Sequence, residues 1–244
     1  MLMLNTKNND MENSKLIVSI YVHTGVNYYR KNEFNVGFYY SKLAEDIQQK
    51  IYPNGHLDLA RTVNTLGAIY FMRGCYNLAL SYSKKSLSIS ENMLSSNHPY
   101  LGVLNMNIGL VFNEMDEVEL GINFGKKAIE IYEKITPSAH GNMAQAFINL
   151  SHSYDLKANY YQALELHKKV SSILEKILPS DHQLNAHNLC RGGKIYYHLN
   201  QTDLALECEL KALNIYEKYS NNTQIATDHS NKTSDSSLRY DGLC

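Results

Sequence analysis

A fixed period of 42 residues runs through most of this chain. The position that Gly67 occupies returns 42 residues earlier and later, and the aromatic position three residues after it returns in the same way. The first column contains Gly25, Gly67, Gly109, Ser151 and Gly193, and the second contains Tyr28, Tyr70, Phe112, Tyr154 and Tyr196. No insertion or deletion interrupts this frame from Val22 to Tyr219. A constant period in this range is typical of a stacked array of structural repeats.

Each repeat is predicted to be a pair of α-helices. In the segment 62–70, Leu66, Ile69 and Tyr70 recur with the i, i+3, i+4 spacing of a helix, and residues 76–89 form the second helix after a turn at Gly74. Small residues recur twelve positions after each repeat's glycine, and we expect the two helices to cross there because small side chains let axes approach within about 8–10 Å. We therefore predict an all-α fold: a right-handed superhelical solenoid of five stacked helix-turn-helix repeats and ten antiparallel helices.

The turn between the two helices also repeats. Asn32, Asp116 and Asn200 share the slot of Gly74, and glycine and asparagine tolerate the left-handed conformation that a helix end needs. Ala158 occupies the slot in the fourth repeat without that tolerance. The array is predicted over residues 13–219 between a flexible lead (1–12) and a disordered polar tail (220–244), because the composition after Tyr219 has almost no apolar residues. The repeats are placed at about 13–56, 57–98, 99–140, 141–182 and 183–219.

Composition excludes several classes of partner. A formal net charge of −1 gives no support for a nucleic-acid or membrane-surface field. No apolar run approaches the ~20 residues that a membrane span needs. Four scattered cysteines are too few for a disulfide framework, so we expect reduced thiols, three of them packed on helices. We expect a cytoplasmic protein that binds neither nucleic acid nor membrane.

The sequence contains no convincing catalytic or metal site. Histidines recur at the joints between repeats, but successive joints lie roughly 10 Å apart or more, too far to share one ion at about 2.0–2.1 Å. We predict instead that these residues cap helix starts: His56, His98, His140 and His182. The zinc motif H-E-x-x-H and the nucleophile motif G-x-S-x-G are absent, and Gly192-Gly193-Lys194 is not part of a complete phosphate loop. We expect no enzyme activity, no cofactor and no metal.

The segment Leu66-Gly67-Ala68-Ile69-Tyr70, followed by Tyr76 and Ala79, resembles the tetratricopeptide repeat (TPR) family. The joints Asn97-His98-Pro99 and Asp181-His182 are similar to the Asp-His-Pro linker of its 42-residue, kinesin-light-chain-like variety. The resemblance covers roughly residues 16–219 and implies a protein-binding scaffold, but TPR arrays serve many processes, so it leaves the partner open.

The resemblance also implies where a ligand binds. In TPR arrays the first helix of each repeat lines a concave groove, with contacts six, three and two positions before the repeat's glycine and one and four after it. The predicted groove residues are Arg61, Thr65, Asn107, Asn149, His152, Arg191 and Lys194. Asn107 and Asn149 hold the same slot in adjacent repeats, and an amide offers both a donor and an acceptor to an extended main chain. The alternative is that these asparagines only cap or solvate a helix face.

The preferred function is an adaptor or scaffold that holds an extended peptide segment of a partner protein. One alternative is a self-associating module whose exposed array ends stack on each other, because no polar capping helix follows the fifth repeat. Another is a regulatory TPR segment of a larger enzyme. A two-carboxylate clamp of the chaperone-binding kind is disfavoured, because Met106 and Leu110 occupy slots that need lysine and asparagine.

Overall fold

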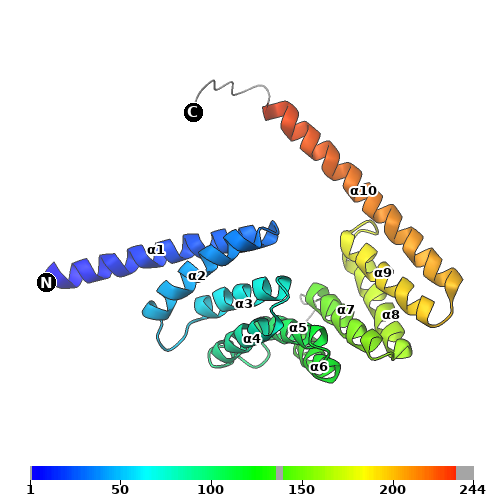
Figure 1. The fold of residues 1–244 in the computed structure, drawn as a ribbon, viewed down its shortest axis with the longest axis horizontal. Helices are drawn as coiled ribbons and strands as arrows, with labels where there is room; N and C mark the ends of the chain where they lie inside the picture. The colour runs from blue at the N-terminus through cyan, green and yellow to red at the C-terminus, as the bar shows by residue number, and fades with distance from the viewer. Residues whose placement is uncertain (1, 136–139, 235–244) are drawn as a thin grey trace. The chain divides into compact units, whose positions relative to one another are not determined.

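The computed structural model describes the backbone of residues 2–135 and 140–234 and the side chains of residues 12–135 and 141–218. Within these ranges the chain forms ten α-helices and no β-strand (Figure 1). The helices are α1 (Leu2–Arg30), α2 (Phe34–Ile51), α3 (Leu57–Met72), α4 (Tyr76–Glu91), α5 (Pro99–Glu114), α6 (Val118–Glu133), α7 (His140–Leu156), α8 (Tyr160–Ile177), α9 (Gln183–His198) and α10 (Thr202–Ser234). The predicted all-α helical repeat fold is confirmed.

The glycine slot lies where the two helices of a repeat cross. A Cβ atom added at Gly67 would lie 3.0 Å from Ser83 Oγ and 3.4 Å from the carbonyl oxygen of Ala79. At Gly109 it would lie 3.1 Å from the carbonyl oxygen of Gly121. The backbones of α3 and α4, and of α5 and α6, are therefore nearly in contact at these points. The sequence prediction for the crossing is confirmed.

The turn slot has a left-handed backbone in all five repeats. The φ angles are +62° at Asn32, +72° at Gly74, +62° at Asp116, +58° at Ala158 and +58° at Asn200. In four of these turns, the carbonyl oxygen of the repeated aromatic residue accepts an N–H from five residues later at 2.9 Å: Tyr28 from Glu33, Tyr70 from Cys75, Phe112 from Glu117 and Tyr196 from Gln201. This bond is the one that closes a helix end through a left-handed residue.

The joint histidines cap the helices that follow them. His56 Nδ1 accepts a hydrogen bond from the Asp58 amide at 3.2 Å, which satisfies one donor of the first turn of α3. The same bond starts α5 and α9, from Tyr100 N to His98 Nδ1 and from Leu184 N to His182 Nδ1, both at 3.1 Å. The capping prediction is confirmed for these three residues, whereas the side chain of His140 lies outside the described residues.

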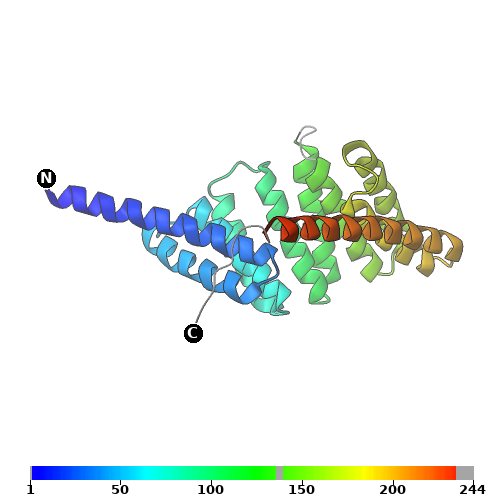
Figure 2. The same cartoon turned by 90° about the horizontal axis from the view of Figure 1, so that it is seen from above.

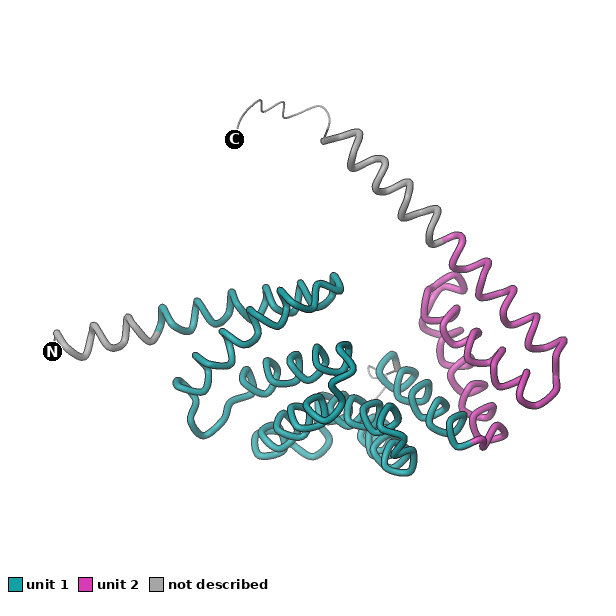
Figure 3. The backbone as a smooth tube through the Cα atoms, in the orientation of Figure 1, with its two compact units in different colours: residues 1–157 teal, residues 158–244 magenta. Residues whose placement is uncertain are grey.

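The chain divides into two compact units, residues 1–157 (unit 1) and residues 158–244 (unit 2) (Figure 3). Unit 1 contains α1 to α7, and its core includes the fully buried Leu66, Leu104 and Ile148. Unit 2 contains α8 to α10, with Leu174 and Ile195 buried. The division falls inside the repeat predicted at 141–182, so the domain boundaries drawn from the sequence remain a prediction.

Both terminal helices extend beyond the predicted array. α1 begins at Leu2, within the expected flexible lead, and α10 continues to Ser234, within the expected disordered tail (Figure 2). No glycine or proline occurs between Thr202 and Ser234, so no strong helix breaker ends α10 earlier. Residues 235–244, which include Cys244, lie outside the described residues.

The cysteine expectation is wrong at one position. Cys75 is exposed and is the N-cap residue of α4, so it is not packed on a helix face. Cys190 on α9 and Cys208 on α10 are half-buried free thiols, as expected.

Candidate functional site

The predicted groove slots lie on the first helices of the repeats. Within unit 1, α1 contacts α3, α3 contacts α5, and α5 contacts α7 (Figure 1). Helices that contact one another in this way bring the same slot of adjacent repeats side by side. The first helices of unit 1 therefore form one continuous row.

A cavity of about 610 Å³ lies between α1, α2 and α3. Two predicted groove residues line it: Arg61, which is exposed, and Thr65, whose hydroxyl donates to the Arg61 carbonyl oxygen at 3.0 Å. Apolar residues of α1 form part of the wall, namely Val18, Val22 and Val26. Further polar and charged residues that line it are Lys15, Ser19, His23, Asn27, Arg30, Gln48, Tyr52 and Asp58. Four cationic or ionisable basic side chains thus surround this cavity with one carboxylate.

Gln48 on α2 lines the same cavity and is fully buried. Neither its Nε2 nor its Oε1 has a hydrogen-bond partner among the described residues. A buried amide left in this state costs about 1–3 kcal/mol. Sequence reasoning missed Gln48 because it lies on a second helix. The sequence did contain one signal, because no other repeat has an amide in the slot of Gln48. The other four repeats have Ser90, Tyr132, Leu174 and Tyr216 there.

Asn107 lines a second, smaller cavity of about 140 Å³ that also includes Tyr29, Phe71 and Leu110. Its Nδ2 donates to Asn64 Oδ1 at 3.0 Å, which joins α5 to α3. This bond uses the Asn107 amide nitrogen and leaves its side-chain oxygen available as an acceptor. Asn64 lies three positions before Gly67, in a slot that the resemblance names, but it was not among the predicted groove residues.

Asn149 and His152 lie on α7 and line neither of these two cavities. Asn149 is largely buried, and its Oδ1 accepts from Gln145 Nε2 at 3.0 Å. Behind it, Asn113 Nδ2 donates to Ser153 Oγ at 2.9 Å and fixes α7 against α5. The asparagines of the repeated slot are therefore held in place by neighbouring amides rather than freely solvated.

Arg191 and Lys194 belong to unit 2. They lie on one face of α9 together with His187, at i, i+4 and i+7. Desolvation lowers the pKa of His187, and the charges of Arg191 and Lys194 lower it further. This face of α9 is therefore a local cluster of positive charge, described apart from the cavities of unit 1.

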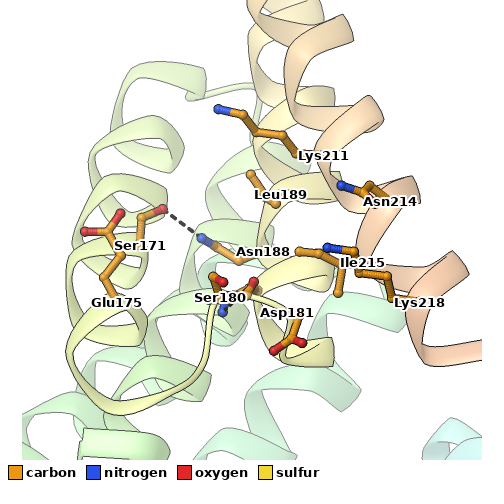
Figure 4. Close-up of a pocket in the computed structure, with 11 residues that line it drawn as sticks. Ser171, Glu175, Ser180, Asp181, Asn188, Leu189, Lys211, Asn214, Ile215 and Lys218 are labelled. Atoms are coloured by element: carbon orange, nitrogen blue, oxygen red, sulfur yellow. Dashed lines mark hydrogen bonds between the residues drawn. The ribbon is translucent and has the colours of Figure 1, made fainter. Parts of the chain in front are cut away.

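Unit 2 contains a polar cavity of about 460 Å³ between α8, α9 and α10 (Figure 4). In it, Asn188 Nδ2 donates to Ser171 Oγ at 3.0 Å. Lys211 and Lys218 line it from α10, opposite Glu175 and Asp181 (Figure 4). None of the predicted groove residues lines this cavity.

The described residues contain neither a metal-binding cluster nor a membrane-spanning helix. No group of three or more His, Cys, Asp or Glu side chains could hold a metal ion there. Among the helices of the same residues, none is both long and apolar enough to cross a membrane.

Comparison with known families identifies the repeat. The family model described as tetratricopeptide repeat matches residues 58–134 and 142–218, more than half of the chain. The chain belongs to the tetratricopeptide repeat family. A comparison with curated proteins found no significant sequence match.

Solved TPR structures share the fold at low sequence identity. A Podosopora anserina protein of nearly identical TPR-like repeats, assigned to the kinesin light chains, is 18% identical with a TM-score of 0.67, covering 84% of this chain and 97% of that chain. BtubC (BKLC) from P. vanneervenii is 13% identical with a TM-score of 0.70, covering 88% and 90%. The Rap conjugation gene regulator of plasmid pLS20, solved in complex with the Phr* peptide, is 13% identical with a TM-score of 0.67, covering 83% and 54%. The predicted kinesin-light-chain-like TPR fold is thus confirmed.

Proposed function

We propose that this protein is a non-catalytic scaffold that binds an extended peptide segment of a partner along the first helices of unit 1. The observation that carries the proposal is the cavity between α1, α2 and α3, which Arg61 and Thr65 line together with Gln48, whose buried amide is unpaired. A concave, partly apolar site with a few convergent polar groups is typical of a ligand-binding site. The proposal places the protein in the cytoplasm with protein partners.

The chemistry of the row suits a main chain. Each peptide group offers one N–H and one C=O, and a carboxamide side chain can satisfy both. Gln48 supplies such a group in the first repeat, and Asn107 and Asn149 supply them in the third and fourth repeats of the chain. The pLS20 Rap regulator, a structure of the same fold, binds a peptide. His152 would extend the row on α7, and Arg191 and Lys194 on α9 would contact an acidic residue of the partner.

Partners are first recovered by pull-down with the intact chain. Their affinity is then measured for wild type and for the double variant Asn107→Ala, Asn149→Ala. Losing one hydrogen bond costs about 0.5–1.5 kcal/mol, so we expect binding to weaken roughly ten- to a hundredfold. Asn77→Ala, an exposed change on the second helix α4, is the matched control and should bind as wild type does. Unchanged affinity in a double variant of normal helicity would refute binding along this row.

A further inference from the structure

Among the described residues, nothing covers the last helix of the array in the way that the next first helix covers every other second helix. α2, α4, α6 and α8 contact α3, α5, α7 and α9, respectively. The column of Gln48, Ser90, Tyr132 and Leu174 is fully buried by these contacts, whereas Tyr216 on α10 is partly exposed. In another column of the same face, Ile129 on α6 is 7% exposed and Leu213 on α10 is 52% exposed.

One substitution makes this face more apolar than the repeat pattern requires. The column that contains Lys42, Lys84, Lys126 and Lys168 in the first four repeats contains Leu210 in the fifth. The lysines have polar or aromatic partners: Lys42 pairs with Glu45 at 2.6 Å, and Lys84 lies 5.4 Å from the ring of Phe112. Leu210 is 57% exposed. We call Leu206, Leu210, Leu213 and Tyr216 the C-terminal face. A contiguous apolar patch of this kind marks a contact surface more often than a single exposed leucine does.

The first helix of the array, α1, exposes apolar residues at positions that are buried in the later first helices. Ile20 on α1 is 55% exposed, whereas its column is at most 4% exposed in later repeats, at Thr62, Leu104, Ala146 and Asn188. Ile17 is also exposed, and its counterparts Leu59 and Leu101 are buried. Ile17 and Ile20, which we call the N-terminal face, thus occupy the positions with which later first helices cover the preceding second helix.

Both end helices are longer than their counterparts in the inner repeats. α3 begins at Leu57, which corresponds to residue 15 of the first repeat, but α1 begins at Leu2. α4 ends at Glu91, which corresponds to residue 217 of the fifth repeat, but α10 ends at Ser234. A second helix ends and the next first helix begins at the same edge of the array, because a short joint connects them. Both helices are therefore longer at the edge where they would run side by side in a stack.

We propose that the C-terminal face of one copy of this chain packs on the N-terminal face of a second copy, head to tail, and continues the register of the repeats. The occupant of each face is a second copy because the interface between successive repeats already pairs these columns. α10 of one copy and α1 of the next lie antiparallel, and their added turns lengthen the contact. Such a heterologous contact generates open chains of copies, or rings where the rotation closes.

The experiment measures the mass of the full-length protein by sedimentation over a range of concentrations. We expect the average mass of wild type to rise with concentration beyond that of a dimer. Leu213→Lys with Tyr216→Lys blocks the C-terminal face, and Ile20→Lys blocks the N-terminal face. Each blocked variant should be monomeric, with its dissociation constant raised at least about tenfold. Leu78→Lys, which changes an exposed leucine on the outer face of α4, is the matched control and should associate as wild type does.

Mixing the two blocked variants separates head-to-tail stacking from other contacts. Each variant retains one intact face, so an equimolar mixture should form a 1:1 heterodimer and nothing larger. A homodimer of Ile20→Lys would show that C-terminal faces pair with each other, which overturns the proposal. A wild-type chain that stays monomeric at every concentration overturns it as well. Circular dichroism of each variant confirms that the helices are intact, and neither outcome depends on a peptide in the groove.

Discussion

Replacing Ala158 with glycine should stabilise the protein. Ala158 has a φ of +58°, and a non-glycine residue in the left-handed conformation costs about 1–2 kcal/mol. Glycine removes this cost but loses more backbone entropy on folding, about 0.5–1 kcal/mol relative to alanine. The difference is a net gain of roughly 0.5–1 kcal/mol in the free energy of unfolding. The side chain of Ala158 is exposed, so little packing is lost.

Urea denaturation followed by circular dichroism measures this gain. With a slope of about 2–3 kcal/mol per molar urea, the midpoint should rise by roughly 0.2–0.5 M. The reverse change, Gly74→Ala, tests the same slot: φ is +72° there, and no atom lies within 4 Å of the added Cβ. Because only the backbone conformation can matter at Gly74, this variant should lower the midpoint. If Ala158→Gly lowers the midpoint or leaves it unchanged while Gly74→Ala lowers it, the left-handed alanine is not strained and the reasoning fails at Ala158.

Two further predictions concern the packed interior. Ala128→Leu should destabilise the protein by about 1–3 kcal/mol, because Ala128 is fully buried, whereas the exposed neighbouring change Lys127→Leu should have little effect in the same urea titration. Burial lowers the pKa of His167 below its ordinary value of 6.5, and its Nδ1 lies 3.1 Å from the Asn188 side-chain oxygen. The unfolded chain therefore binds a proton more readily than the folded one, so stability should decline as pH falls below about 6.5. The melting temperature should drop less steeply between pH 7 and pH 5 in His167→Gln, and parallel curves would exclude His167 as the cause.

Features set by a residue and its near neighbours could be predicted from the sequence. The left-handed turn at Asn32, the crossing at Gly67 and the cap at His98 each need one residue type at one place in the 42-residue period. Each residue preference is weak at a single turn, crossing or cap. Because the 42-residue period repeats each position about five times, the combined preference predicts the structure strongly. The same averaging explains why Ala158 could be placed in the turn slot although alanine does not favour that backbone.

Features that depend on pairing between helices could not be predicted in this way. The bond between Asn107 and Asn64 joins two repeats, and nothing in either helix alone identifies the partner. Glu45 shows the same limit. Burial alone would raise the pKa of its carboxyl, but the hydrogen bonds and charges of Lys42 and of Lys85 on α4 outweigh burial and lower the pKa. α1 begins before, and α10 ends after, the bounds drawn from composition, because a polar composition does not by itself end a helix.

Two residues of the proposed contact surfaces differ from their counterparts in the other repeats. In a stacked array, contacts between repeats favour the same kind of residue at the same slot, so a departure that worsens packing needs another cause. Gln48 places an unpaired amide in a column where Leu174 is apolar and where the hydroxyls of Ser90 and Tyr132 are also buried without a partner. Leu210 exposes an apolar side chain in a column that is otherwise lysine. Each departure is unfavourable for the isolated chain, and each lies on one of the two proposed contact surfaces. A ligand amide would remove the first cost, and a second copy of the chain would remove the other.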